Sequence, residues 1–232
     1  MNYQQQMQMK RWLNRPIVTY SFLAIQSAVF IFGFLVPGSL MESSGMMFGP
    51  AIAVYHQYWR FVTPIFIHLS LAHFAINSVV LYFLGQQVEA IYGHGRFLIL
   101  YLLSGIMGNV VSFAFNEAGV SSAGSSTAIF GIFGAFLILG MHFKRNPGIQ
   151  AMVRQFSLFV GFSLVFGIFD RTIDMWGHIG GLLGGLLLGN ILALPNNHGK
   201  FNLHTRVISG MIFVFLLIIS IVYGLNKYDF LL

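Results

Sequence analysis

Seven long apolar segments dominate the sequence and constrain its fold more than any other feature. A helix needs about 20 apolar residues to cross a lipid bilayer, and the segments lie near residues 17–36, 71–91, 97–116, 126–143, 151–169, 177–194 and 207–225. Only 8% of the residues are charged, whereas roughly a quarter are charged in soluble domains. The sequence therefore predicts an all-α fold, a polytopic membrane helical bundle. No small-residue cleavage site follows the first segment, so we expect it to remain as an anchor.

The basic residues indicate how the bundle is oriented. With the N-terminus inside, the inner face receives nine of the twelve Lys and Arg residues: Lys10, Arg11, Arg15, Arg96, Lys144, Arg145, Arg154, Lys200 and Arg206. The outer face then receives Arg60, Arg171 and Lys227. Because basic loops stay on the cytoplasmic side, we expect the N-terminus inside and the C-terminus outside. The net charge of +6 is then a signal of topology, and we expect no nucleic-acid partner.

Three parts follow from this order of segments. Residues 1–16 form a basic N-terminal cytoplasmic arm, residues 17–195 a six-span core, and residues 196–232 a polar inner loop with an additional C-terminal span. A long loop from Pro37 to Arg60 follows the first span, and long loops of this kind are usually functional or disordered.

In the predicted topology, spans two, four and six all begin at the outer face, and each begins with polar residues. They are His68 just before span two, His73 and Asn77 within it, Ser126 in span four, and His178 in span six. Ionisable residues within spans are costly and indicate function by default. His73 and Asn77 share a helix face because they are four apart, and both can donate hydrogen bonds to a developing negative charge. Asn77 could equally form a structural hydrogen bond between helices, and His68 could be an interfacial residue in contact with water.

Ser126 follows Gly124 and Ser125 at the predicted start of an apolar helix, where unpaired N–H groups and the helix dipole favour negative charge. The run of hydroxyl residues could also simply cap the helix. In span six Gly177, Gly181, Gly185 and Gly189 recur every four residues and form a glycine stripe along the helix that carries His178. Such a stripe allows close approach of a neighbouring helix. If that helix is span four, Ser126 and His178 lie at equal depth, and the histidine can activate the serine as a nucleophile. The stripe could instead face span two or another copy of the chain.

Taken together, these motifs resemble the rhomboid intramembrane serine proteases over about residues 59–189. The residues that match in order are Trp59-Arg60, His68, His73-x-x-x-Asn77, Gly124-x-Ser126 and His178-x-x-Gly181-x-x-x-Gly185. The resemblance implies that Ser126 is the nucleophile and His178 the general base. It also implies an oxyanion hole formed by His73, Asn77 and the backbone N–H of Ser126.

The sequence departs from the rhomboid pattern at two positions. Thr127 follows the expected nucleophile where the family usually has glycine, which puts the local turn in question. Phe130 stands where the family often has tyrosine, and we expect it to stack on His178 without the hydroxyl. The resemblance further implies that the loop before span two braces the core, with Arg60 as a hydrogen-bonding strut.

Two acidic residues are predicted to take no part in catalysis. Asp174 is four residues before His178 and suggests a Ser-His-Asp triad, but the resemblance implies a dyad, and we expect Asp174 to be solvated. Glu89 lies near the inner end of span two, where we expect it to tie the turn at residues 93–95.

The function that follows is an intramembrane serine endopeptidase in the bacterial cell membrane, which cleaves transmembrane protein substrates near their outer end. Its partners would be those substrates and the lipid bilayer, with no cofactor. The chain has no cysteine, and its histidines lack the spacing of a zinc site, so we expect no metal. The alternatives are an inactive rhomboid-like protein that binds transmembrane clients, a histidine-lined transporter or channel, and a metalloprotease or haem protein.

Overall fold

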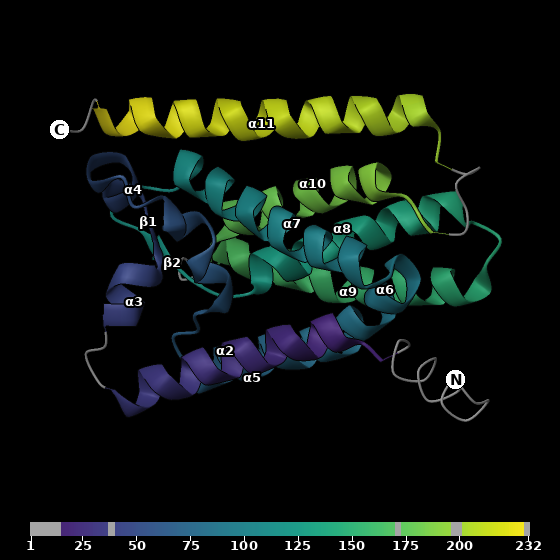
Figure 1. Ribbon diagram of the computed structural model, residues 1–232, viewed down its shortest axis with the longest axis horizontal. Coiled ribbons are helices and arrows are strands. Elements are labelled where there is room, and N and C mark those ends of the chain that lie inside the picture. The colour runs from purple at the N-terminus through teal and green to yellow at the C-terminus, as the bar shows by residue number, and fades with distance from the viewer. Residues whose placement is uncertain (1–14, 37–39, 170–172, 196–200, 230–232) are drawn as a thin grey trace, which may run out of the picture.

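A bundle of long helices forms the body of the protein, as the computed structural model shows for residues 15–36, 40–169, 173–195 and 201–229 (Figure 1). The long helices are α2 (Ile17–Leu35), α5 (Leu71–Val80), α7 (His94–Phe115), α8 (Ser126–His142), α9 (Pro147–Phe169), α10 (Met175–Leu192) and α11 (Leu203–Asp229). Helix α5 continues through a π-helical turn, η3 (Leu81–Gly85), into α6 (Gln86–Tyr92). The predicted all-α bundle is confirmed, and every predicted span coincides with helix.

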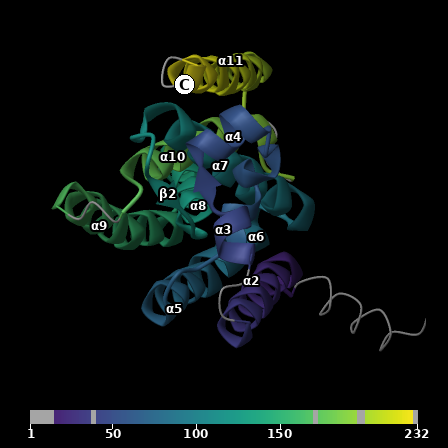
Figure 2. The ribbon, with the colours of Figure 1, turned by 90° about the vertical axis from the view of Figure 1, so that its left-hand side faces the viewer.

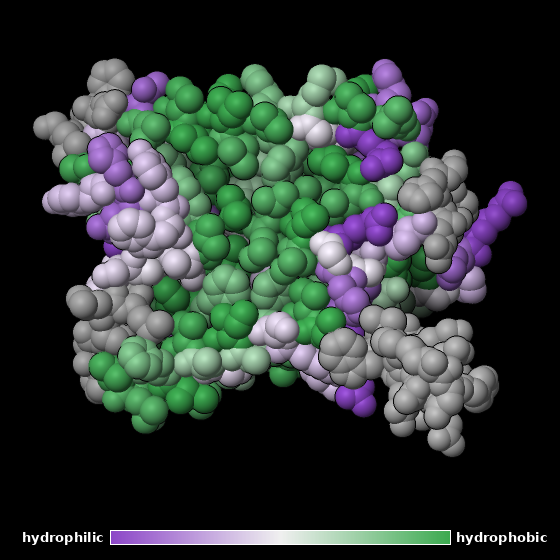
Figure 3. Space-filling model, in the orientation of Figure 1, coloured by the Kyte–Doolittle hydropathy of each residue, from purple (hydrophilic) through white to green (hydrophobic). Residues whose placement is uncertain are grey.

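Six of these helical stretches in the described residues are long and apolar enough to cross a membrane. The exception is α8, with 17 residues. The molecular surface in Figure 3 is mostly apolar in the middle of the bundle and more polar at its two ends. The chain is therefore a multi-pass membrane protein. Its orientation stays a prediction, and four of the basic residues used for it, Lys10, Arg11, Arg171 and Lys200, lie outside the described residues.

Helices α7, α8 and α10 form the centre, and glycines on α10 set how closely they approach. A Cβ on Gly181 would collide with the backbone of Thr127, and a Cβ on Gly185 would collide with the backbone of Gly131. Span four is thus the partner of the glycine stripe, as predicted. A second glycine face was missed: Gly180 and Gly184 lie against α7. The missing side chains let α10 pack closely against two helices at once.

The remaining helices surround this centre. Seen along the bundle in Figure 2, α11 lies on one side against α7 and α10, and α2 and α5 lie on the opposite side. Helix α9 packs mainly against α8, and few of its residues are buried.

Short elements close one end of the bundle, the end at which α5, α8 and α10 begin, and it is called the loop end below. They are α3 (Leu40–Gly45), β1 (Met47–Phe48), α4 (Gly49–Tyr55), η1 (Tyr58–Phe61), η2 (Thr63–Phe66) and β2 (Ser121–Ser122). The two strands are antiparallel, with Met47 opposite Ser122.

Arg60 holds the first part of these elements together. Its side chain donates to the carbonyls of Met46 at 2.6 Å and Ser43 at 2.9 Å, and to Gln57 Oε1 at 2.7 Å. The predicted strut therefore has the expected contacts. The neighbouring Trp59 is half exposed and donates its Nε1–H to the Ser44 carbonyl at 3.0 Å.

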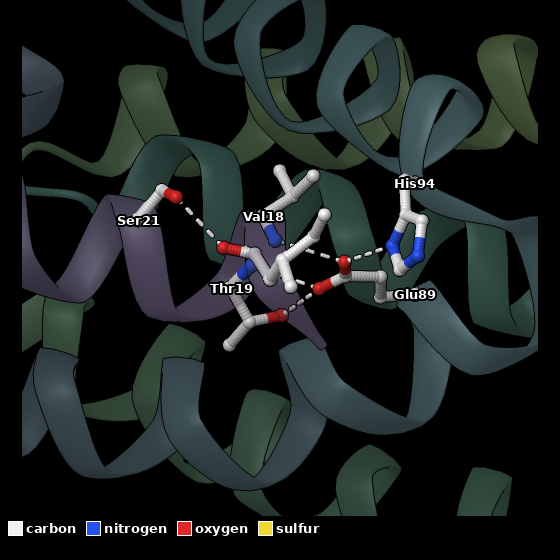
Figure 4. Close-up of polar contacts among 6 residues, drawn as sticks. Val18, Thr19, Ser21, Glu89 and His94 are labelled. Carbon is white, nitrogen blue, oxygen red and sulfur yellow. Dashed lines mark hydrogen bonds and ion pairs between the residues drawn. The ribbon is translucent and has the colours of Figure 1, made fainter. Parts of the chain in front are cut away.

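Glu89 of α6 binds the start of α2 (Figure 4), and both lie at the end of the bundle opposite the loop end (Figure 1). As predicted, it contacts the turn after α6, where Oε1 lies 2.5 Å from His94 Nδ1. The sequence did not indicate its larger role. The buried carboxylate also accepts from the backbone N–H groups of Val18 and Thr19, at 2.9 and 2.8 Å, and from Thr19 Oγ1 at 2.6 Å. Glu89 thus satisfies N–H groups that the first turn of α2 leaves unpaired.

Replacing Glu89 by glutamine is expected to lower the free energy of unfolding by about 1–3 kcal/mol. The amide NH₂ would face donors that now meet a carboxylate oxygen. Thermal unfolding in detergent measures the effect. Glu117→Gln makes the same chemical change at an exposed acid and should stay within about 0.5 kcal/mol of the parent. Equal losses of unfolding free energy in the two variants would contradict the role given to Glu89.

Candidate active site

Ser126 and His178 meet where α8 and α10 begin. Ser126 is the first residue of α8, and its Oγ lies 2.9 Å from Nε2 of His178, in the first turn of α10. The close packing of α8 on α10 through the glycine stripe brings the two side chains to the same depth. A neutral imidazole with its proton on Nδ1 can accept a hydrogen bond from the serine at Nε2.

The capping interpretation of the serines does not hold in the structure. Ser125 occupies the N-cap position of α8, but its side chain makes no capping hydrogen bond. Its Oγ instead lies 3.3 Å from Nε2 of His68.

Phe130, one turn after Ser126, stacks on His178. The ring centroids are 4.2 Å apart and the planes differ by 11°, so the expected stacking exists without a hydroxyl group. The imidazole is thereby held between an aromatic ring and the serine.

Asp174 lies before His178 without hydrogen-bonding to its ring. Among the described residues, His178 Nδ1 is buried with no hydrogen-bond partner, which fits a dyad. The expectation that Asp174 is solvated was wrong. Its carboxylate caps α10 through Gly177 N–H at 2.7 Å. It also accepts from Ser112 Oγ at 2.6 Å, Ser122 Oγ at 2.5 Å and Asn116 Nδ2 at 2.9 Å.

Gly124 brings the loop before α8 against His73. Its φ of +133° is rarely adopted by other residues, and a Cβ would lie 2.7 Å from both Cε1 and Nε2 of the His73 ring. Only glycine therefore fits at this position without strain.

Asn77, one turn after His73 on α5, is buried and donates Nδ2–H to the His73 carbonyl at 3.0 Å. This bond lies within α5, so it gives no support to the alternative of a bond between helices. The amide carries a second N–H for another acceptor.

His68 does not lie at a water interface, contrary to one of the two interpretations offered from the sequence. It lies just before α5 and is only 3% exposed. Burial, and to a lesser degree the neighbouring His73, lowers the pKa of His68 from 6.5 to about 4. The neutral ring supports Ser125, which is fully buried next to Ser126 and was not predicted to be part of the site.

A cavity of about 720 Å³ contains the site. Ser126, His178, His73 and Asn77 all line it. Part of its wall was not predicted: it comes from the segment around β2, from Ile173 and from the α9 residues Phe162 and Ser163. The cavity thus lies between α5 and α9, with the polar groups on an otherwise mostly apolar lining. In the described part of the chain, no three His, Asp or Glu side chains come together as a metal site.

Comparison with known proteins identifies the family. The family model of the rhomboid domain matches residues 55–195, which include all the cavity-lining polar groups named above. The chain belongs to the rhomboid family. Relatives of this rhomboid include the rhomboid protease GluP of Bacillus subtilis, 35% identical over 216 residues, which cover 92% of this chain and 41% of that protein. The chain thus spans less than half the length of GluP.

Two further relatives extend the comparison. The Bacillus subtilis protein YdcA is 30% identical over 174 residues, which cover 75% of this rhomboid and 86% of YdcA. RHOMBOID-like protein 1 of Arabidopsis thaliana is 32% identical over 170 residues, which cover 72% of this rhomboid and 43% of that protein.

Thr127, the departure from the usual rhomboid glycine, fits into the bundle without disturbing α8. It is buried against Gly108 of α7, where a Cβ would lie 2.7 Å from the Thr127 Cβ. Glycine at position 108 therefore leaves the room that the threonine occupies, and α8 begins at Ser126.

Proposed function

We propose that this rhomboid is an intramembrane serine endopeptidase, with Ser126 as nucleophile and His178 as general base. The observation that carries the proposal is the 2.9 Å contact between Ser126 Oγ and His178 Nε2 within a cavity in the membrane-spanning bundle. A histidine in hydrogen-bond reach of a serine can remove its proton as the serine attacks.

The reaction is an acyl transfer to Ser126. Oγ attacks the peptide carbonyl while its proton passes to His178 Nε2, and the tetrahedral intermediate expels the amine, which takes that proton. Water, deprotonated by His178, then hydrolyses the acyl-enzyme and regenerates the serine. The stack of Phe130 on His178 keeps the ring in place during these proton transfers.

The negative charge on the carbonyl oxygen needs donors on the same side of the cavity. Asn77 and His73 line the cavity together with Ser126, and the backbone N–H of Ser126 lies at the N-terminus of α8. We assign these three groups to the oxyanion hole, where each preorganised donor stabilises the transition state.

The position of the cavity fits a substrate that arrives within the membrane. It is lined by α5 on one side and α9 on the other, and few residues of either helix are buried. A transmembrane helix must unwind locally before its carbonyl can be attacked, so we expect small or helix-breaking residues near the cleaved bond. With the N-terminus inside, the loop end faces outward, and the cleaved bond lies near the outer end of the substrate.

The partners, the location and the bounds of the protease core are part of the same proposal. The partners are transmembrane protein substrates and the lipid bilayer, in a bacterial cell membrane, and the Bacillus relatives support this location. Residues 17–195 would be the protease core, with the span after residue 196 as an addition.

An inactive member that binds transmembrane clients is the second candidate. It is disfavoured because both reacting groups are present and hydrogen-bonded. A transporter would need polar groups through the depth of the membrane, whereas the groups named here gather at the loop end.

Two assays in detergent or liposomes test the proposal: cleavage of a single-span substrate with a helix-destabilising outer end, and labelling by a fluorophosphonate, which reacts with activated serines. We expect the parent protein to cleave and to be labelled, and Ser126→Ala to do neither. Ser21→Ala, at an exposed serine on α2, is the matched control and should retain both. Cleavage by Ser126→Ala would refute the nucleophile. A parent that neither cleaves nor reacts would favour the client-binding candidate.

A further inference from the structure

Asn116 links three helices at the loop end. It is the C-cap residue of α7, and its carbonyl accepts a hydrogen bond from Nζ of Lys227, near the end of α11. Its side chain donates Nδ2–H to Asp174 Oδ1 at 2.9 Å. One residue thus connects the C-terminal span to the start of α10.

Asp174 lies between Asn116 and the turn of α10 that carries His178. The same carboxylate oxygen accepts from Gly177 N–H at 2.7 Å and caps α10. Gly177 is the residue before His178. Two side chains, Asn116 and Asp174, therefore separate the ammonium group of α11 from the turn that carries the histidine.

An aromatic stack makes a second, independent connection between the same helices. Tyr223 of α11 stacks on Phe115 of α7 with 5.4 Å between ring centroids. Phe115 in turn contacts Trp176 of α10 at 4.9 Å. Trp176 lies two residues before His178, so this contact also ends at the first turn of α10.

Tyr228, the neighbour of Lys227, fixes the position of the end of α11. It is 3% exposed and stacks on Phe113 with a centroid distance of 5.4 Å. Its hydroxyl lies so close to α4 that a Cβ on Gly49 would collide with it. The end of α11 is thus held by α7 and α4 together, and it cannot slide freely along the bundle.

Lys227 is an unusual residue for such a place. A lysine in an apolar helix is costly unless its charge is compensated. Here Nζ also lies 3.4 Å from the carbonyl of Ala114, so it meets two of the carbonyls left unpaired at the C-terminus of α7. Lysine in this position satisfies those carbonyls and complements the helix dipole.

From these contacts we infer that Lys227 is a positioning residue for the protease reaction. Through Asn116 and Asp174 it sets the first turn of α10, and thereby the approach of His178 to Ser126. The inference rests on the proposed function and extends it: the C-terminal span is part of the apparatus that aligns the dyad, and not only a seventh anchor in the membrane.

The test compares three variants in the full chain. Lys227→Met removes the donors and keeps the apolar stem, and Lys227→Arg restores donors. Arg206→Met is the matched control, because Arg206 Nε donates to the Ile191 carbonyl at 3.0 Å and so ties the other end of α11 to the other end of α10. The readouts are kcat and KM for the single-span substrate, the rate of fluorophosphonate labelling, and the thermal midpoint.

We expect Lys227→Met to lower kcat and the labelling rate by about tenfold, since small misplacements of reacting groups have effects of this size or larger. KM should not change, and Lys227→Arg should recover most of the loss. Arg206→Met should keep the parent kcat even if it lowers the thermal midpoint as much as Lys227→Met does. Should Lys227→Met not fold, Lys227→Gln, which keeps one donor, should show a smaller loss of kcat.

The inference would be overturned if Lys227→Met had the kcat and labelling rate of the parent protein, or if Lys227→Met and Arg206→Met lost kcat equally. Either result would leave the proposed function standing. A parent protein that neither cleaves nor is labelled would overturn both.

Discussion

Replacing His178 by alanine is expected to reduce cleavage by about 10⁶-fold, the loss found when the serine or the histidine of a catalytic serine protease site is removed. Without the imidazole no group accepts the proton of Ser126, whose Oγ lies 2.9 Å from Nε2. Labelling of Ser126 by a fluorophosphonate should fall together with cleavage, because both need the activated hydroxyl. Parallel measurements of the two rates on folded protein check this.

The chain offers a matched control at the other end of the same pair of helices. His142 of α8 contacts Asn190 of α10, with Nε2 and Oδ1 3.3 Å apart. His142→Ala therefore also removes an imidazole that joins α8 to α10, but far from Ser126. It should keep near-parent rates. If His178→Ala cleaved as well as His142→Ala, the base assigned here would be wrong.

Replacing Gly185 by alanine is expected to destabilise the bundle by about 3 kcal/mol or more, at the upper end of the cost of overpacking a core. The new methyl group would collide with the carbonyl oxygen, carbonyl carbon and Cα of Gly131. These are backbone atoms, so no side chain can rotate away, and α8 and α10 must separate. Thermal unfolding in detergent and the amount of folded protein in membranes measure the loss.

The control for this variant is Gly161 on α9, where a Cβ meets nothing within 4 Å. Gly161→Ala makes the same change in a helix and should raise stability slightly, since alanine is the better helix former by about 1 kcal/mol. A Gly185→Ala protein as stable as Gly161→Ala would show that α8 and α10 do not pack as described.

The residues that bear on function could be predicted largely because membrane helices restrict where polar side chains lie. Ser126, His178, His73 and Asn77 are exceptional in segments that are otherwise apolar, and they recur at the starts of alternate spans. The structure places all four around one cavity. The four-residue period of the glycines likewise indicated a tight contact, and the partner inferred for it, span four, was correct.

Residues whose partners lie far along the chain could not be predicted in this way. Asp174 looks like a solvated residue in a loop because nothing near it in sequence reveals Ser112, Asn116 and Ser122, which all donate to it in the folded chain. Glu89 was assigned to the nearby turn, but it also binds the start of α2, some 70 residues away.

The sequence by itself determined the class of fold, the number of predicted spans and the polar groups at their starts, because the cost of exposing charge and backbone to lipid acts on each segment separately. Only the tertiary structure decided which groups meet. Packing brings Phe162 and Ser163 of α9 to the cavity and seats Lys227 on the end of α7. Such contacts depend on how whole helices lie against one another, and the pattern of any one segment does not contain that information.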